Sequence, residues 1–137
     1  MEQKEKTRFD PAEAGGLALA YLGDSVIEVM VRRRLITTGI RDVGRLNRMA
    51  LDFVRASAQS AAVERLLPLL DEEETAVFRR GRNAHSGSVP HSASAVDYRR
   101  ATGMEALFGY LFLTGREKRL SELFDICYPA EDNVDER

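Results

Sequence analysis

The stretch "LALAYLGDSVIEVMV", residues 17–31, decides the fold and raises the first question about function. Its apolar side chains recur every three or four residues, which predicts a largely buried helix. Asp24 lies in the middle of this stretch, directly after Gly23. Because a carboxylate removed from water without a partner is strongly destabilising, we expect one of two explanations. Either Asp24 caps a helix that begins at Ser25, or it has a partner elsewhere in the chain.

A second acid of the same kind is Glu105, in the apolar segment "GMEALFGYLFL" at 103–113. Glu105 could pair with an arginine, reach solvent, or meet Asp24 at a shared cation. Mg²⁺ is a suitable cation because it takes one or two carboxylates and keeps water or phosphate oxygens as its other ligands. Small residues near the two acids would allow a bulky backbone to approach: Gly23, Ala101 and Gly109.

The rest of the chain predicts a single all-α domain over residues 1–137, a helical bundle of about six or seven helices. Its 137 residues and 44% hydrophobic content suffice for one core, and alternating strand patterns are missing. We expect Ser57 and Ser94 to cap helices, Asp71 and Glu74 to form a capping box, and residues 1–11 and 130–137 to fray. The expected helices span about 16–37, 43–56, 57–70, 71–80, 95–114 and 116–128, with a loop over 81–94.

Several classes of protein do not fit this sequence. No run of about 18 uncharged apolar residues is present, and the charged start "MEQKEKTRFD" is unlike a signal peptide. The lone Cys127 cannot form an internal disulfide and is expected to be a buried thiol. We therefore expect a cytoplasmic protein. His85 and His91 lack the glutamates of a di-iron bundle, and glycine-rich phosphate loops are missing as well.

Arginines are concentrated in two segments although the net charge is −2. Residues 32–55 hold seven arginines and two acids, and residues 75–104 hold five arginines and one acid. Such segments can be ordinary solvated helix surface, or they can bind phosphates.

Three motifs together resemble the ribonuclease III family, and most closely its Mini-III branch, which has a catalytic domain without a double-stranded-RNA-binding domain. "YLGDSVIEVMV" is similar to the signature helix of the family, "RRGRNAHSGS" to its Arg-Gly loop, and "GMEALFGYLFL" to its second acidic helix. The resemblance extends from about Gly15 to Leu123. The family generally has two further acids, at the positions of Ala20 and Thr102 here, and the Mini-III branch shows a similar departure.

The resemblance implies a homodimeric, Mg²⁺-dependent endonuclease for double-stranded RNA that leaves 5′-phosphate and 3′-hydroxyl ends. Within the branch, the associated role is the maturation of the 23S ribosomal RNA precursor. Asp24 and Glu105 would be the catalytic and metal-binding residues. Because the site has few protein ligands, we expect weak Mg²⁺ binding in the absence of substrate. The residues expected to bind RNA are Arg80, Arg82, Asn83, His85, Ser86, Arg99 and Arg100.

Two other functions stay open at this point. Ala20 and Thr102 are compatible with a non-catalytic RNA- or ribosome-binding module of the same fold. A helical protein–protein adaptor would use the arginines only as surface, and would not require Asp24 and Glu105 to meet.

Overall fold

The computed structural model describes residues 9–84 and 94–130, and every regular element in these ranges is helical. The predicted all-α class is therefore confirmed, with six α-helices and two short 3₁₀ turns in the described part. The elements are η1 (Pro11–Glu13), α2 (Gly16–Ile36), α3 (Val43–Val54), α4 (Ala56–Leu66), η2 (Leu67–Leu69), α5 (Glu72–Asn83), α6 (Ala95–Leu113) and α7 (Glu117–Cys127).

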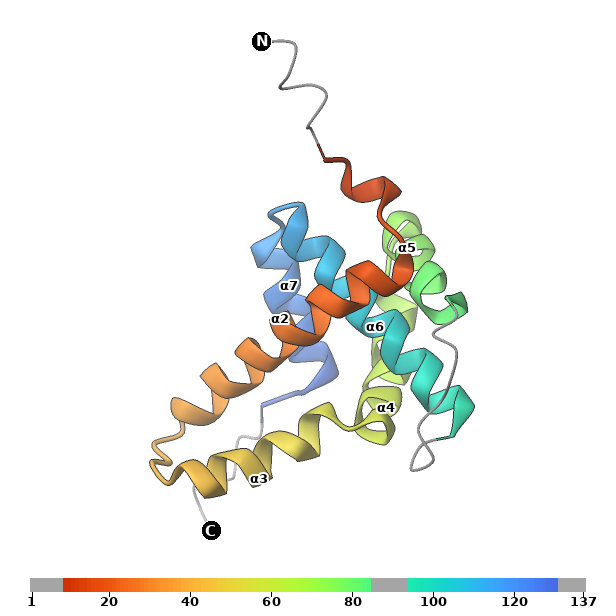
Figure 1. Cartoon of the computed structure of the whole chain (residues 1–137). Coiled ribbons are helices and arrows are strands. Elements are labelled where there is room, and N and C mark those ends of the chain that lie inside the picture. Colours follow the sequence, from red (N-terminus) through yellow and green to blue (C-terminus); the bar gives the residue numbers. More distant parts are fainter. Residues whose placement is uncertain (1–8, 85–93, 131–137) are drawn as a thin grey trace.

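Helices α2 and α6 cross at the centre of the molecule (Figure 1). Their backbones touch where both carry glycine, because a Cβ added to Gly23 would lie 1.6 Å from the carbonyl oxygen of Glu105. A Cβ added to Gly109 would lie 2.1 Å from the carbonyl oxygen of Leu19. These two glycines allow the helices to approach closely, and this approach brings Asp24 beside Glu105.

The cap predictions are confirmed at two helices and wrong at one. Asp71 and Glu74 form the capping box of α5, and the Ser94 hydroxyl accepts a hydrogen bond from the Asp97 amide at the start of α6. Ser57 does not cap α4, which begins one residue earlier, after Arg55, without a side-chain cap. Because α3 ends at Val54, Arg55 lies between two nearly continuous helices and leaves no separate turn for a serine cap.

The loop expected from residue 81 begins later than predicted. Helix α5 continues through Asn83, and Gly81 packs against α6, where an added Cβ would lie 2.5 Å from the Ala106 Cβ. The glycine is used for close packing and does not end the helix.

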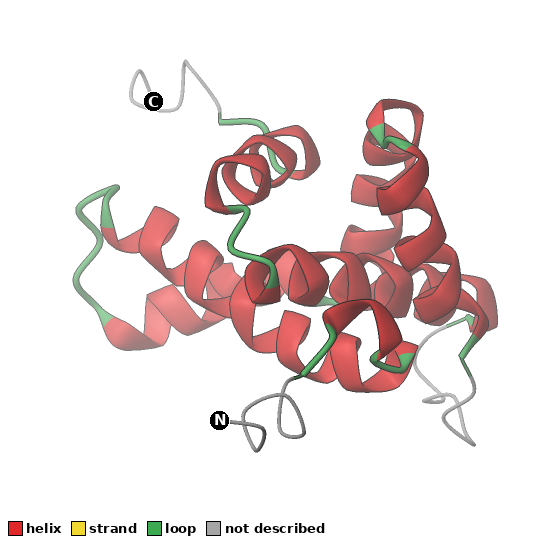
Figure 2. Ribbon diagram, turned by 90° about the horizontal axis from the view of Figure 1, so that it is seen from above, coloured by secondary structure: helices red, strands yellow, loops and turns green. Residues whose placement is uncertain are grey.

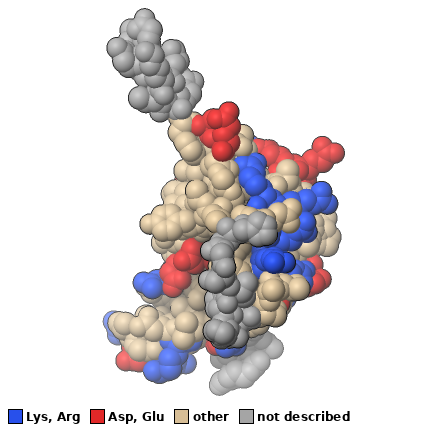
Figure 3. Space-filling view, turned by 45° about the vertical axis from the view of Figure 1, so that its right-hand side comes forward, with Lys and Arg blue, Asp and Glu red and all other residues tan. Residues whose placement is uncertain are grey.

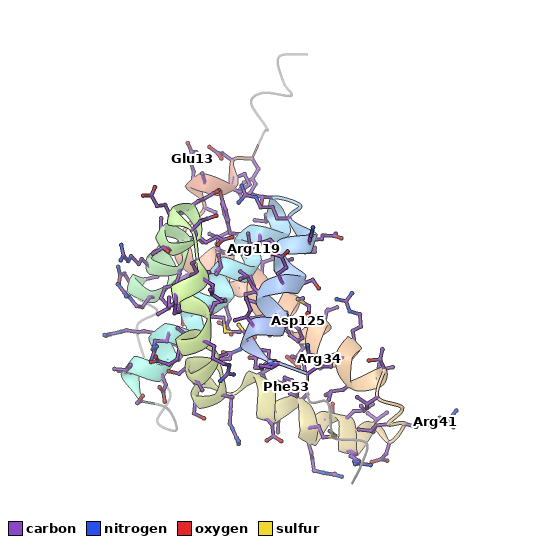
Figure 4. The ribbon with its side chains drawn as sticks, turned by 180° about the vertical axis from the view of Figure 1, so that it is seen from behind. Glu13, Arg34, Arg41, Phe53, Arg119 and Asp125 are labelled. Carbon is purple, nitrogen blue, oxygen red and sulfur yellow. The ribbon has the colours of Figure 1, made fainter. Side chains whose placement is uncertain are left out.

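The C-terminal half of α2 and α3 form an arm that projects from the other helices (Figure 2). The end of α7 holds the base of this arm: Arg34 pairs with Asp125 at 2.7 Å, and the Tyr128 hydroxyl donates to the Phe53 carbonyl at 2.8 Å. Arg34, Asp125 and Phe53 are labelled in Figure 4.

Helices α5 and α7 are joined through a buried carboxylate. Glu74 is 2% exposed and accepts hydrogen bonds at 2.8 and 2.9 Å from the Arg119 guanidinium. Arg119 holds the pKa of Glu74 below its usual value, against the opposing effect of burial.

Cys127 is fully buried, as expected, and burial raises the pKa of its thiol to about 12. Among the described residues, no helix is both long and apolar enough to cross a membrane.

Candidate active site

Asp24 lies within a continuous helix and does not begin one. Helix α2 runs unbroken from Gly16 to Ile36, so the alternative of a helix capped by Asp24 is wrong. The side chain is exposed, although Gly23, Val26 and Ile27 around it are buried. Asp24 therefore stands at the edge of the α2–α6 crossing, with its carboxylate toward solvent.

Glu105 meets Asp24 from the opposite helix. Its side chain is half-buried in α6, and the two carboxyl groups are in hydrogen-bonding contact. Burial, followed by the charge of Asp24 and the hydrogen bond to it, raises the pKa of Glu105 to about 8. One proton is thus held between two acids at neutral pH, where a cation could replace it.

The pair opens into a cavity of about 400 Å³ between α2 and α6. Ala20 and Thr102 line this cavity together with the two acids. Ala20 contributes only a methyl group, and the Thr102 hydroxyl donates to the Tyr98 carbonyl of its own helix at 2.9 Å. Neither residue supplies a carboxylate, so this part of the cavity has room for water or substrate oxygens.

The donor set fits a divalent cation of the Mg²⁺ type. Two carboxylates with unfilled space beside them match an ion that keeps most of its ligands as water or phosphate. Across the described ranges, histidine, cysteine, aspartate and glutamate side chains nowhere gather in a group of three or more that could hold a metal. The Asp24–Glu105 pair is therefore the candidate metal site, and it is a sparse one.

Two of the arginines expected to bind RNA form hydrogen bonds or an ion pair within the protein. The Arg80 guanidinium donates to the carbonyls of Ala12 and Ala14 at 2.9 and 2.7 Å, which ties η1 to α5. Arg100 pairs with Glu64 of α4 at 2.6 Å and is only 21% exposed. Both therefore have a structural contact as well as their charge.

The other expected RNA-binding residues lie at the two ends of the loop. Arg82 is half-buried and donates to the Asn83 side chain at 3.2 Å, while Asn83 and Arg99 are exposed. His85 and Ser86 fall outside the described residues. Figure 3 shows several Lys and Arg side chains close together on one face of the molecule.

Comparison with known proteins decides the family. Residues 17–116 match the family described as Ribonuclease III domain. The chain is 47% identical over 114 residues to a Mini-ribonuclease 3 from Symbiobacterium thermophilum, covering 83% of this chain and 88% of that protein. The chain belongs to the Mini-ribonuclease 3 branch of the ribonuclease III family.

Two further relatives agree with this assignment. A Mini-ribonuclease 3 from Brevibacillus brevis is 45% identical over 121 residues, covering 88% of this chain and 90% of that protein. A crystal structure of a protein from Fusobacterium nucleatum superposes with a TM-score of 0.79 at 28% identity, covering 86% of this chain and 96% of that one. The chain thus shares its fold with this solved structure over most of its length.

Sequence reasoning missed one polar residue beside the site of this ribonuclease III domain. Gln59 of α4 is 1% exposed and lines a second cavity that also reaches Glu105. In the sequence it lies in "ASAQSAAV", where a lone glutamine indicates nothing about burial or partners.

Proposed function

We propose that this chain is a Mg²⁺-dependent homodimer that cleaves double-stranded RNA and acts in maturation of the 23S ribosomal RNA precursor. Membership of the family makes it an endoribonuclease of ribonuclease III type. The proposed parts are the Mg²⁺ dependence, the duplex substrate, the 5′-phosphate and 3′-hydroxyl products, the dimer and the ribosomal role. The single observation that carries the proposal is the contact between Asp24 and Glu105 at an open cavity.

The roles of the two acids follow from this geometry. Asp24, on the exposed side, would bind a cation first, and Glu105 would bind it after transferring its proton to solvent water. When bound, Mg²⁺ would activate a water and stabilise the negative charge that develops on the phosphate. The space beside Ala20 and Thr102 would admit the phosphate oxygens that complete the site. The contact also argues against the adaptor hypothesis, which gives the two acids no reason to meet.

RNA binding is assigned mainly to the exposed side chains on either side of the loop. A-form RNA presents rows of phosphates and a wide minor groove with 2′-hydroxyls, so it is recognised largely by shape. Arg99 at the start of α6, with Arg82 and Asn83 at the end of α5, can donate hydrogen bonds to these groups. Arg80 and Arg100 would add positive charge while they hold η1 and α4 in place.

The proposed dimer uses an apolar groove that lies next to Asp24 on α2. The groove has a volume of about 740 Å³ and is lined by α2, α6 and α7. Val29 is 63% exposed and Phe112 is 48% exposed in it, and Arg33, Glu117 and Lys118 supply both signs of charge. Apolar side chains with mixed charges suit a second copy of the same surface. Such a dimer would place one active site for each strand of a duplex.

Cleavage of duplex RNA in Mg²⁺ tests the proposal. We expect the wild type to cut and Asp24→Asn to be slower by about 100-fold or more, the scale of losing one group that stabilises transition-state charge. Glu28→Gln is the matched control, since Glu28 is one turn further along α2 and pairs with Arg32 at the surface. It should cut like the wild type.

The alternative is a non-catalytic binding module, favoured by the apolar Ala20 and by Thr102 at the site. It predicts that wild type and Asp24→Asn bind duplex RNA equally and that neither cuts several structured RNAs. That result would overturn the enzymatic proposal and leave the fold assignment intact.

A further inference from the structure

Gln59 is a buried side chain whose hydrogen-bonding groups are unsatisfied. It is 1% exposed, and within the described part of the chain neither Nε2 nor Oε1 has a hydrogen-bond partner. The amide offers two donors and an acceptor, and burying such a group unpaired is destabilising. A side chain in this state calls for a partner outside the described residues, and water or a ligand can supply it.

The unpaired amide does not result from loose packing of α4. The same α4–α6 interface includes the Arg100–Glu64 ion pair at 2.6 Å. Ala62, Val63 and Leu66 of α4 are completely buried. The helix is therefore held tightly, with Gln59 in a fixed position.

The cavity that Gln59 lines includes several polar side chains and reaches Glu105. It has a volume of about 500 Å³ between α4 and the first half of α6, and its lining includes Ser57, Asp97 and Thr102. Because one water needs about 30 Å³, the cavity has room for several. Glu105, Thr102 and Tyr98 line both this cavity and the one that holds Asp24. Glu105 thus lies between Gln59 on one side and Asp24 on the other.

We propose that Gln59 is a positioning residue for Glu105: its amide, through water in the α4–α6 cavity, orients the carboxylate toward a cation shared with Asp24. This inference rests on the proposed metal-dependent function and adds a residue to it. Hydrogen bonds donated to a carboxylate favour its charged form, which is the form that binds a metal. Groups that orient a metal ligand in this way typically change metal affinity or activity by about 10- to 100-fold.

The proposed metal site depends on the orientation of Glu105 because it has few carboxylates. Because positions 20 and 102 hold alanine and threonine, Glu105 is one of the two carboxylates at the proposed metal site. Its orientation therefore decides whether the metal has one or two protein carboxylates as ligands. A Glu105 oriented from the α4 side keeps its carboxylate available to a cation shared with Asp24, because Glu105 lines both cavities. Gln59 would therefore act on metal binding without touching RNA.

The test compares Gln59→Leu, which keeps the volume and removes the amide, with the wild type. Mn²⁺ binding to the protein is measured by electron paramagnetic resonance, and the Mg²⁺ concentration for half-maximal cleavage is measured with duplex RNA. We expect Mn²⁺ affinity to fall by about 10-fold or more and the Mg²⁺ midpoint to rise by a similar factor. Thermal stability should be equal or higher, because the apolar replacement has no amide to leave unpaired. Gln59→Asn should restore part of the metal affinity.

Ser60→Ala is the matched control, because Ser60 is 5% exposed on the same helix and does not line the cavity. It should leave the metal dependence unchanged. Equal Mn²⁺ affinity and Mg²⁺ midpoint in Gln59→Leu and wild type would overturn the inference while the proposed function stands. A wild type that binds Mn²⁺ and does not cut would overturn the function, and the Mn²⁺ comparison would still decide the role of Gln59. Because weak binding is expected without RNA, the titration extends to millimolar Mn²⁺, and a wild type that binds no Mn²⁺ there would overturn both.

Discussion

Glu105 should make the metal-free protein less stable as pH rises. Its pKa is raised to about 8 in the folded state, by burial first and then by Asp24, from an unfolded value of 4.5. The folded state therefore holds a proton that the unfolded state loses between these two values, and stability falls as pH rises through this window. From pH 5 to pH 8 the wild type should lose on the order of 3 kcal/mol relative to Glu105→Gln.

Urea denaturation of both proteins at the two pH values, in the presence of a chelator, measures this difference. The exposed Glu13, changed to Gln, controls for the loss of one negative charge. A stability difference between wild type and Glu105→Gln that is the same at pH 5 and pH 8 would show that folding does not raise the pKa of Glu105.

At the residue scale, part of the site could be predicted from the sequence. Asp24 and Glu105 stand out because each is a charge within an apolar helical pattern, and the expectation that they meet agrees with their contact. Gln59 could not be predicted in this way, because its burial and its lack of hydrogen-bond partners depend on how the helices pack. The hydrogen bonds from Arg80 to two backbone carbonyls could not be predicted either, because they also depend on how the elements pack.

At the element scale, the crossing of α2 and α6 depends on Gly23. An added methyl group would lie 1.6 Å from the Glu105 carbonyl oxygen and 2.9 Å from the Gly109 amide nitrogen, and backbone atoms cannot move aside separately. We expect Gly23→Ala to destabilise the protein by about 3 kcal/mol or more. It should also separate Asp24 from Glu105, so cleavage should fall even at temperatures where the variant is folded.

Gly44→Ala on α3 is the matched control for this change. The nearest atoms to its added Cβ are side-chain tips at 3.4 and 3.5 Å, so this variant should be as stable as wild type or gain up to about 1 kcal/mol. Urea denaturation compares the two variants. Equal stability of Gly23→Ala and Gly44→Ala would contradict the close crossing.

Most elements could be predicted because their signals are local. The capping box of α5, the Ser94 cap and the positive φ of Gly39 and Gly115 at helix ends all follow from nearby residues. The early loop start at residue 81 was wrong because a distant helix decides the outcome there. Gly81 suggests a loop by itself, yet it stays helical because α6 packs on it.

At the scale of the whole molecule, the apolar groove predicts a dimer that one charge should break. Val29→Glu places a carboxylate in the proposed interface at a residue that is 63% exposed, so the fold should survive. Light scattering after size-exclusion chromatography should show a dimer for wild type and a monomer for Val29→Glu. Val43→Glu on α3, at 67% exposure, should stay dimeric. A wild type that is monomeric would remove the proposed interface.

RNA affinity should depend steeply on salt, since phosphate contacts release counterions. Arg99→Ala should weaken binding of a duplex and reduce the slope of log affinity against log salt by about 1. Arg41 is the control because it is exposed at the tip of the arm (Figure 4). Fluorescence anisotropy from low to moderate salt tests this. An unchanged affinity across the salt range would exclude phosphate contacts as its main source.

The central claim is that Asp24 and Glu105 bind one divalent cation together. Anomalous diffraction from a crystal of the protein with duplex RNA and Mn²⁺ tests it most directly. We predict a Mn²⁺ peak bound by both carboxylates at about 2.1–2.2 Å, the scale of metal–oxygen bonds for small divalent ions, with water or phosphate as the other ligands. A Mn²⁺ bound elsewhere, with Asp24 and Glu105 still in contact only with each other, would contradict the account.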